Sequence, residues 1–352
     1  MSAKVSVIMP SLNVGRYIRQ CIDSVTGQTL KDLEIICVDA GSDDGTLEIL
    51  QEAASSDPRI RIIHSDKRSY GYQMNLGLEQ ATGEYIGIIE TDDWAEPCMF
   101  SRLCDAAQGD LDVVKSSFWF YYSVPKEKNT LFNIPSKYQA AGVFCPTADL
   151  KRGPEMADFF NIKPSIWSAI YRREFLEKNS IRFNETPGAS YQDAGFNFKV
   201  WACADKVRIM QDAFLHYRQD NEQSSVNSPA KVMCVCDEYH EIERFIGETF
   251  TGEKKEMLLA LMVRLKYDSY VWNYERLAAP LDREFARNVR EEIAADLKNG
   301  YAREEYFPPF KWESLTMWSQ DADRFADEMD RRNSRSAVRK AAEKIRRMLR
   351  RG

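Results

Sequence analysis

The chain has 352 residues, of which 44% are hydrophobic and 29% charged, so we expect a globular protein with one large domain and a smaller one. Its net charge is -6, but residues 331–352 hold ten Lys or Arg and one acid, a net +9, which leaves -15 for the remainder. No apolar run is long enough to cross a bilayer and no signal peptide precedes the first strand pattern, which favours a cytoplasmic protein over a secreted or membrane-spanning one.

The first strand, helix and strand follow a regular alternation. Residues 4–10 form a short β-branched run that Pro10 ends, as in a buried parallel strand, and Ser11 opens the turn after it. A helix is predicted next from apolar residues at helical spacing. Residues 33–38 make the second strand, which ends at Asp39 in a Gly-, Ser- and Asp-rich turn. Such a turn can approach a nucleotide closely, or it can simply cap the following helix.

Two further strands complete this half of the chain. Residues 59–64 form a strand that leads into a basic loop with Lys67 and Arg68, followed by a helix. Residues 85–89 form the fourth strand. Strands alternating with helices predict a parallel sheet with right-handed crossovers, whose loops after Pro10, residue 38 and residue 89 gather at one edge.

An acidic group follows the fourth strand. Glu90, Asp92 and Asp93 come directly after the apolar run, and Pro97 prevents the strand from continuing. Carboxylates at the carboxyl edge of an open α/β sheet suit a Mg²⁺ or Mn²⁺ ion that also binds a diphosphate. The alternative is a solvated acidic turn, and only the rest of the chain decides between the two.

The second half of the domain is less regular. We expect a strand at residues 111–117, a long excursion over 123–150 that forms a lid or acceptor wall, and short strands near 165–171 and 182–183. Tyr191, Gln192 and Asp193 open a helix. Residues 207–210 and 213–217 are interpreted as a closing hairpin, and the polar segment from Arg218 to Pro229 as a mobile loop.

From residue 231 the pattern is helical, so we divide the chain into a domain at 1–228, a helical domain at 229–330 and a tail helix at 331–352. The first domain has a donor half (about 1–110) and an acceptor half (about 111–228). The tail is basic on one side and apolar on the other, which suits the anionic inner face of a membrane. A solvated tail or a contact in a homo-oligomer is the alternative. Nucleic acid is not expected, because the acidic body offers no basic groove.

With these motifs assembled, residues 4 to about 225 resemble a family-2 glycosyltransferase of the GT-A fold, an α/β fold with a Rossmann-like, mostly parallel central sheet. The motifs occur in the family's order and spacing, and they include Val5-Ser-Val-Ile-Met-Pro10, Glu34-Ile-Ile-Cys-Val-Asp39, Asp44-Gly-Thr46, Asn75-Leu-Gly77, Gly83-Glu-Tyr-Ile86 and Thr91-Asp-Asp93.

The resemblance implies a role for each motif. Asp93 would be the metal ligand, with Asp92 on the metal or the ribose. Asp39 would hold the base of the donor, with Pro10 and Ser11 beside it. Asp193 would be the catalytic base, next to Gln192 on the acceptor side. His216 is the candidate for an additional metal ligand late in the domain, and an ordinary strand histidine is its alternative.

Three departures from the family's pattern affect donor recognition and the base. Ala40 stands where a second acid is usual, which puts specificity for uridine in doubt. Met74 replaces a basic residue, so Lys67, Arg68 or Gln73 must cover the base or diphosphate. Gln192 replaces the Glu of a Glu-Asp pair and keeps hydrogen bonding without the charge, whereas Asp193 is intact.

The reaction expected from the resemblance is transfer of a sugar from a nucleoside diphosphate donor to an acceptor hydroxyl, with inversion, in cell-surface polysaccharide or glycoconjugate synthesis. Arg218 would close over the diphosphate, and Trp167 would form part of an aromatic platform for a saccharide or lipid-linked saccharide acceptor. The alternatives are a sugar nucleotidyltransferase, for which the Gly-rich phosphate loop is missing, and a non-catalytic nucleotide-sugar binding module.

Overall fold

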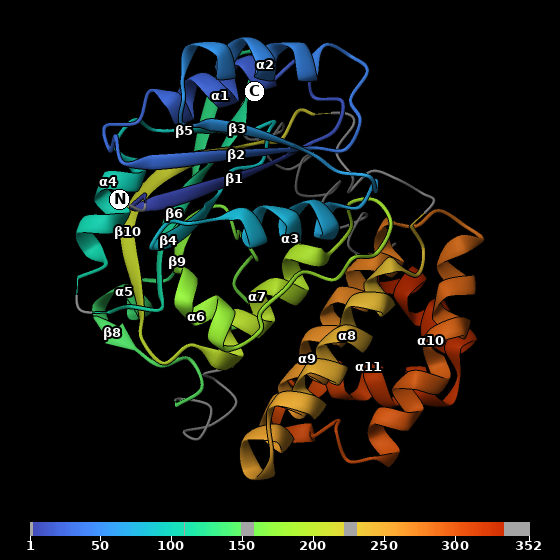
Figure 1. The fold of residues 1–352 in the computed structure, drawn as a ribbon. Coiled ribbons are helices and arrows are strands. Elements are labelled where there is room, and N and C mark those ends of the chain that lie inside the picture. Colours follow the sequence, from blue (N-terminus) through green and yellow to red (C-terminus); the bar gives the residue numbers. More distant parts are fainter. Residues whose placement is uncertain (1–2, 109, 149–157, 222–230, 334–352) are drawn as a thin grey trace, which may run out of the picture. The chain divides into compact units, whose positions relative to one another are not determined.

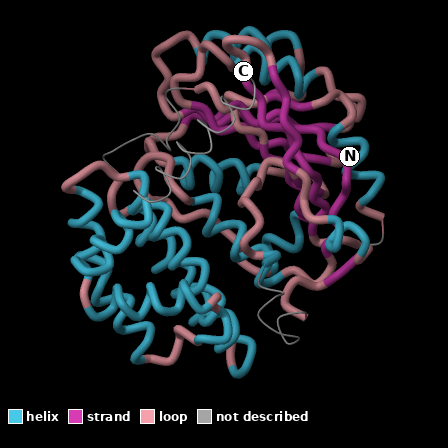
Figure 2. Tube along the Cα trace, turned by 180° about the vertical axis from the view of Figure 1, so that it is seen from behind, coloured by secondary structure: helices cyan, strands magenta, loops and turns pink. Residues whose placement is uncertain are grey.

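The computed structural model describes residues 3–108, 110–148, 158–221 and 231–333 and divides the chain into two compact units. The first unit comprises residues 1–228 together with 236–245, and the second comprises 229–235 and 246–352. Among the described residues the named strands all belong to the first unit, as the magenta segments in Figure 2 show, and the second unit consists of helices and loops. Part of helix α8 (Cys234–Thr249) therefore belongs with the sheet domain.

The first unit is built on one mixed sheet with the strand order β3-β2-β1-β4-β9-β6-β10-β5. β7 pairs with β6 and β8 pairs with β10, both antiparallel. The β-branched runs predicted as buried parallel strands form β1, β2 and β4, and every residue of β1 and β4 is buried. The strands are β1 (Val5–Ser11), β2 (Leu33–Asp39), β3 (Ile60–His64), β4 (Tyr85–Ile88), β5 (Trp94–Ala95), β6 (Val113–Tyr122), β7 (Lys128–Phe132), β8 (Val143–Phe144), β9 (Ala169–Arg172) and β10 (Val207–Arg218).

Strand directions decide which residues share an edge of this sheet. β1 is parallel to β2 and β4, and the register pairs Ser11 with Asp39. β9 is antiparallel to both β4 and β6, and β6 is parallel to β10. The carboxyl ends of β1, β2, β4, β6 and β10 therefore lie at one edge, and the residues that precede β9 lie there too. This edge carries the candidate site.

Helices cover both faces of the sheet, with α1 and α2 on one side and α3, α6 and α7 on the other in Figure 1. In α1 the buried residues are Ile18, Cys21, Ile22 and Val25, which is the apolar spacing that predicts a helix. The predicted fold class, a mostly parallel GT-A-like sheet with a helical C-terminal region, is confirmed. The helices of this unit are α1 (Ile18–Thr26), α2 (Thr46–Ser56), α3 (Tyr70–Gln80), α4 (Met99–Ala106), α5 (Ser136–Ala140), α6 (Arg173–Lys178) and α7 (Gln192–Cys203).

The predicted closing hairpin is wrong. Residues 207–218 form the single strand β10, which runs parallel to β6. Gln211 and Asp212 are accommodated by register shifts between Met210 and Ala213, so the polar pair bulges out of the strand where a turn was expected. Residues 182–183, expected to be a short strand, have no strand structure.

The second unit contains α9 (Gly252–Arg276), α10 (Leu281–Lys298), the 3₁₀ helix η4 (Glu304–Tyr306) and α11 (Pro309–Gln320). Its core is aromatic: the rings of Trp318 and Phe325 stack with centroids 4.0 Å apart. The buried ammonium of Lys266 is neutralised by Glu292 at 2.8 Å and Asp296 at 2.5 Å. None of the helices in the described part of the chain is long and apolar enough to cross a membrane.

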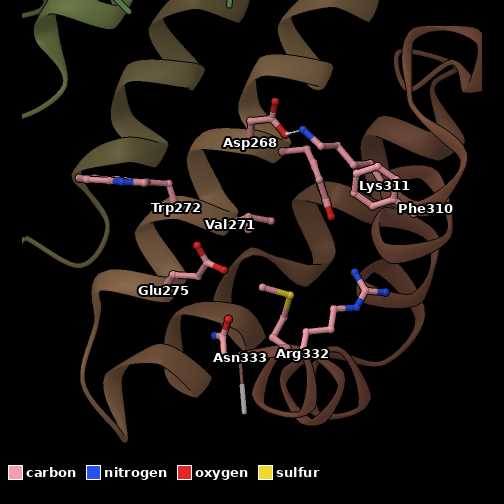
Figure 3. A pocket seen from close by; sticks show the side chains of 10 residues that line it. Asp268, Val271, Trp272, Glu275, Phe310, Lys311, Arg332 and Asn333 are labelled. Carbon is pink, nitrogen blue, oxygen red and sulfur yellow. Dashed lines mark hydrogen bonds and ion pairs between the residues drawn. The ribbon is translucent and has the colours of Figure 1, made fainter. Parts of the chain in front are cut away.

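A cavity of about 370 Å³ opens between α9, α11 and residues 329–333 of this unit (Figure 3). Its wall is mixed in character, with Val271 and Phe310 beside Glu275 and Arg332. Asp268 and Lys311 form an ion pair of 2.7 Å across one side of it.

Candidate active site

The acidic group predicted after the fourth strand lies at the carboxyl edge of the sheet. β4 ends at Ile88, and Thr91 donates a hydrogen bond from Oγ1 to the carbonyl of Pro10 at 2.8 Å, which fixes the acidic turn against the end of β1. Asp93 is 1% exposed, and its backbone N–H donates to the carbonyl of Glu90 at 3.0 Å. Glu90 and Asp92 are partly exposed. The turn therefore carries three carboxyl groups, of which that of Asp93 is buried.

Arg218, at the end of β10, forms hydrogen bonds with this acidic turn. Its backbone N–H donates to Asp93 Oδ1 and its Nε to the carbonyl of Asp92, both at 2.8 Å. The guanidinium is buried between the rings of Tyr17 and Tyr121, with centroids at 4.6 and 4.9 Å. We expected Arg218 to begin a mobile loop. It is instead the last residue of β10, and its hydrogen bonds and ring contacts hold it in place.

The carboxylates of Asp92 and Asp93 differ in their hydrogen-bond partners. Asp93 Oδ2 is buried without a hydrogen-bond partner in the described residues, while Asp92 Oδ2 accepts from Asn221 at 2.8 Å. Burial, and then the charge of Asp92, raises the pKa of Asp93 well above its usual range. The described residues hold no cluster of three or more His, Cys, Asp or Glu suited to a metal. Two carboxylates fit an ion that takes its other ligands from water and substrate phosphate.

Asp193 lies in the first turn of α7, on a different segment of the same unit. Tyr191, which precedes the helix, has φ 55°, in the left-handed region that non-glycine residues rarely adopt. Asp193 Oδ1 accepts a hydrogen bond from the N–H of Ala194 at 2.9 Å. Burial raises the pKa of Asp193, and the charge of Lys163 opposes that rise. A carboxyl with a raised pKa is better matched to proton transfer near neutral pH.

Glu90 and Tyr217 connect Asp193 to the acidic turn. Burial raises the pKa of Glu90 to about 8, and the charges of Asp92 and Asp193 both add to the rise. The pKa of Tyr217 is raised by burial and then by Asp93, Asp193, Asp92 and Glu90. The charges of Asp193 and Asp92 therefore both act on the same carboxyl group, that of Glu90. Sequence reasoning placed Glu90 in the acidic group after the fourth strand, but it did not place Tyr217 or Lys163 in the site, since neither belongs to a motif.

The carboxylate of Asp39 is hydrogen-bonded by neighbouring groups of the protein. Asp39 is fully buried, and its carboxylate accepts hydrogen bonds from the N–H groups of Gly41 and Ser42 and from the hydroxyls of Ser11 and Ser42. Gln73 donates from Nε2 to the carbonyls of Ser11 and Val38 at 2.9 and 2.7 Å. Asp39 thus shapes the turn after β2, and Pro10 and Ser11 at the end of β1 lie beside it in register.

The predicted basic residues Lys67 and Arg68 lie in the loop before α3. Lys67 is exposed, 4.0 Å above the ring of Tyr72 and 3.8 Å from Glu185. Arg68 donates to the carbonyl of Gly41 in the turn after β2 at 3.2 Å. Arg68 is therefore the one of the two that reaches the turn shaped by Asp39.

The two predicted acceptor residues are buried. Trp167 is 5% exposed and packs on Tyr217 and Phe118, with ring centroids 4.9 and 4.6 Å away. Gln192 is 1% exposed and donates from Nε2 to Thr186 Oγ1 at 2.9 Å, which closes the loop before α7. The partners of both side chains lie within the protein.

His216 is also engaged by protein groups. Its Nδ1 lies 2.8 Å from Asn129 Oδ1, its Nε2 lies 2.9 Å from Glu96 Oε1, and its ring stacks on Trp94 at 3.6 Å. Burial lowers the pKa of His216. No cluster in the described residues joins it to Asp92 and Asp93.

Comparison with known proteins identifies the class. Residues 6–199 match Glycosyl transferase family 2. The chain therefore belongs to this family, as its motifs indicated.

Its relatives among curated proteins are bacterial glycosyltransferases. It is 33% identical over 231 residues to the uncharacterized glycosyltransferase EpsJ of Bacillus subtilis, covering 64% of each chain. It is 36% identical over 230 residues to glycosyltransferase GlyG of Streptococcus pneumoniae, covering 62% of this chain and 72% of that one. The match thus spans less than two thirds of EpsJ.

Among solved structures, the fold is similar to that of S. aureus TarS 1-349 in complex with UDP-GlcNAc, with a TM-score of 0.69 and 18% identity. The match covers 94% of this chain and 92% of the TarS chain, so the similarity of fold includes most of the helical region.

Proposed function

We propose that this protein is an inverting glycosyltransferase that moves a sugar from a nucleoside diphosphate-sugar to an acceptor hydroxyl. The proposal is supported by the electrostatics of two acidic segments that are distant in sequence: the charges of Asp92 and of Asp193 both raise the pKa of Glu90. Asp92 and Asp93 follow β4, whereas Asp193 lies in the first turn of α7, about 100 residues later in the chain. In this proposal Asp92 and Asp93 serve the donor diphosphate, and Asp193 serves as the base.

Asp193 accepts the proton of the acceptor hydroxyl in this proposal. As the oxygen attacks the anomeric carbon, its O–H bond breaks toward Asp193, and the bond between that carbon and the diphosphate oxygen breaks on the opposite face. A single displacement of this kind inverts the anomeric centre. It needs one base and no protein nucleophile, whereas a double displacement needs two carboxylates close together.

Asp92 and Asp93 would hold a Mg²⁺ or Mn²⁺ ion, which supplies charge neutralisation for the departing diphosphate when it is bound. Within the described residues, Asp93 offers a buried oxygen that has no hydrogen-bond partner. Arg218 donates to the carboxylate of Asp93 and to the backbone carbonyl of Asp92, so it holds the acidic turn in place. These contacts occupy Arg218, so its proposed role is to support the acidic turn and not to bind the diphosphate. His216 stays a weaker candidate ligand, because Glu96 and Asn129 occupy both ring nitrogens.

The names of similar proteins support a nucleotide-sugar donor and a saccharide acceptor. The TarS structure contains UDP-GlcNAc, and a segment of 109 residues is 37% identical to the chondroitin synthase of Escherichia coli. We propose that the turn shaped by Asp39, together with Ser11 and Arg68, receives the nucleoside, and that the acceptor is a cell-surface polysaccharide or glycoconjugate.

The experiment is a screen of common sugar nucleotides for nucleotide release in the presence of Mn²⁺, with and without an oligosaccharide acceptor. We expect one donor to be consumed, metal-dependent turnover, and a product whose anomeric configuration by proton NMR is opposite to that of the donor. Retention of configuration would contradict the mechanism. No turnover with any donor, despite nucleotide binding detected by a thermal shift, would favour a binding module instead.

A further inference from the structure

Lys163 is an exposed lysine in the segment before β9 and belongs to none of the motifs that identify the family. Its Nζ lies 5.3 Å from the centroid of the Tyr217 ring, and its charge acts on Asp193. Within the described residues, Lys163 has neither a hydrogen bond from its ammonium nor an ion pair. An exposed ammonium without a carboxylate partner in contact is free to respond to a charge in the site.

The topology explains how this lysine comes to the site. β9 is antiparallel to its neighbours β4 and β6, so the segment before it emerges at the same edge as the carboxyl ends of those strands. The acids after β4 lie at that edge. Lys163, six residues ahead of Ala169 at the start of β9, therefore lies toward the edge of the sheet that carries the acidic group.

A buried lysine anchors the turn that carries Lys163. Lys115 of β6 is 2% exposed, and its ammonium donates to the carbonyl of Ser165, to Ser165 Oγ at 2.8 Å and to Ser168 Oγ at 3.0 Å. Ser165 donates its N–H to the carbonyl of Lys163 at 2.7 Å. Trp167 of the same turn packs on Tyr217. The backbone at Lys163 is thus fixed before any substrate binds, as a preorganised site requires.

Apart from Lys163, the described residues whose charge is coupled to Asp193 are carboxylic acids and tyrosines. Carboxylates that crowd one site favour protonation of one another, and a nearby cation opposes this. Arg218 is committed to Asp92, Asp93 and Gln20. The titratable groups whose charge is coupled to Asp193 are Lys163 from the turn before β9, Tyr70 from α3, Glu90 after β4, Tyr217 from β10 and Glu238 from α8. Lys163 is the cation of that set.

We propose that Lys163 is a positioning residue for Asp193, whose ammonium keeps that carboxylate ionised and ready to accept the proton of the acceptor. This inference rests on the proposed function, since it presumes that Asp193 is the base. It adds a residue that the family's motifs do not contain.

The test is the pH dependence of kcat/KM for Lys163→Met and Lys163→Arg. We expect the acidic limb of the profile, which reports the pKa of the base in the free enzyme, to move to higher pH in Lys163→Met. Each unit of displacement lowers the rate about tenfold below the limb, whereas the rates converge with wild type at high pH. Lys163→Arg should keep the wild-type limb. Lys137→Met, which removes an exposed lysine 4.9 Å above the Tyr138 ring and 3.5 Å from Asp158, is the control and should leave the acidic limb where it is in the wild type.

A second measurement follows Asp193 without turnover. A water-soluble carbodiimide with an added amine labels protonated carboxyls, and peptide mass spectrometry reports the pH at which Asp193 loses its reactivity. That pH should be higher in Lys163→Met. An unmoved acidic limb and an unmoved labelling pH would overturn the proposal, as would a pH-independent rise in donor KM, which would mean contact with the diphosphate. If Asp193→Asn left transfer intact, the proposed function itself would fail instead.

Discussion

Asp39 is the last residue of the strand β2, and Asp93 follows the strand β4. In the sequence both are acids at the end of an apolar run, but in the structure their surroundings differ. Asp39 accepts hydrogen bonds from Ser11, Gly41 and Ser42, while one oxygen of Asp93 is buried without a partner in the described residues. A motif predicts that a carboxylate stands at the edge of the sheet. Whether it is free for a ligand depends on hydroxyl and backbone donors nearby, which residue spacing does not reveal.

The surroundings of Glu238, a residue outside any motif, were likewise not predictable from residue spacing. It is fully buried on α8, and its Oε2 has no hydrogen-bond partner among the described residues. A Cβ added to Gly195 would lie 2.5 Å from that oxygen, so the carboxyl packs directly against the first turns of α7. Burial raises the pKa of Glu238 to about 8. Helical periodicity gave no reason to expect an acid in that position.

This raised pKa predicts how stability changes with pH. The unfolded carboxyl ionises near its model value of 4.5 and the folded one near 8, so the unfolded state binds fewer protons between these values. The free energy of unfolding contributed by Glu238 therefore falls as pH rises through that window. Glu238→Gln removes the loss, so its Tm relative to wild type should be higher at pH 8 than at pH 4.5, measured by thermal denaturation.

Glu241 on the same helix provides a control of opposite sign. Arg244 and Lys199 hydrogen-bond its carboxylate and hold its pKa low despite partial burial. The stability it contributes is present above its unfolded pKa and is lost as pH falls through the lower folded value. Glu241→Gln should therefore lower Tm at pH 8. Equal Tm shifts for the two variants at pH 8 would contradict the assignment of their charge states.

At the scale of elements, apolar runs and their end signals predicted the parallel strands and the helices between them. β1 and β4 are continuous buried runs. Ser11 at the end of β1, and Asp92 and Asp93 after β4, are the residues that the sequence predicted for the site. β10 was missed because Gln211 and Asp212 have the composition of a turn, and only pairing with β6 turns them into a bulge. The antiparallel direction of β9, which brings Lys163 to the site, has no signal in the sequence.

Helix α3 makes a close backbone contact that predicts the effect of a substitution. A Cβ on Gly71 would lie 1.8 Å from the backbone oxygen of Asn184, so Gly71→Ala forces the helix and residues 184–185 apart. We expect a loss of about 1–3 kcal/mol in the free energy of unfolding, as is typical of overpacking. Denaturation with urea measures it.

Gly247 in α8 is the matched control. It is exposed, and the nearest atom to an added Cβ is Lys255 Nζ at 4.0 Å. Gly247→Ala should stabilise by up to about 1 kcal/mol, because alanine has the higher helix propensity. If Gly71→Ala were as stable as Gly247→Ala, the close approach of α3 to residues 184–185 would be wrong.

At the scale of the whole molecule, charge is separated along the chain. Residues 334–352, which lie outside the described residues, contain eight Lys or Arg and one acid, while the chain as a whole has a net charge of -6. The predicted tail helix and its membrane role therefore stay predictions. A basic segment gains about 1 kcal/mol per Lys or Arg near an anionic surface.

Deletion of residues 334–352 tests this role. If the tail is an anchor, the truncated chain should lose sedimentation with vesicles containing phosphatidylglycerol, and 0.5 M salt, on the order of several times physiological ionic strength, should release the full chain. Vesicles of phosphatidylcholine alone are the control. Unchanged partitioning after the deletion would leave the tail without a membrane role.

The family and fold were accessible from the sequence because the motifs lie at strand ends in a fixed order, whereas the surroundings of each acid were not. The central claim is that Asp93 serves the donor and Asp193 serves the acceptor within one site. Binding of the nucleoside diphosphate selected by thermal shift, measured by calorimetry with and without Mn²⁺ alongside turnover, tests it most directly. We expect Asp93→Asn to lose Mn²⁺-dependent nucleotide affinity, and Asp193→Asn to keep that affinity while kcat falls by about 10²–10⁴. Equal loss of nucleotide affinity in both variants, or full turnover in Asp193→Asn, would contradict the claim.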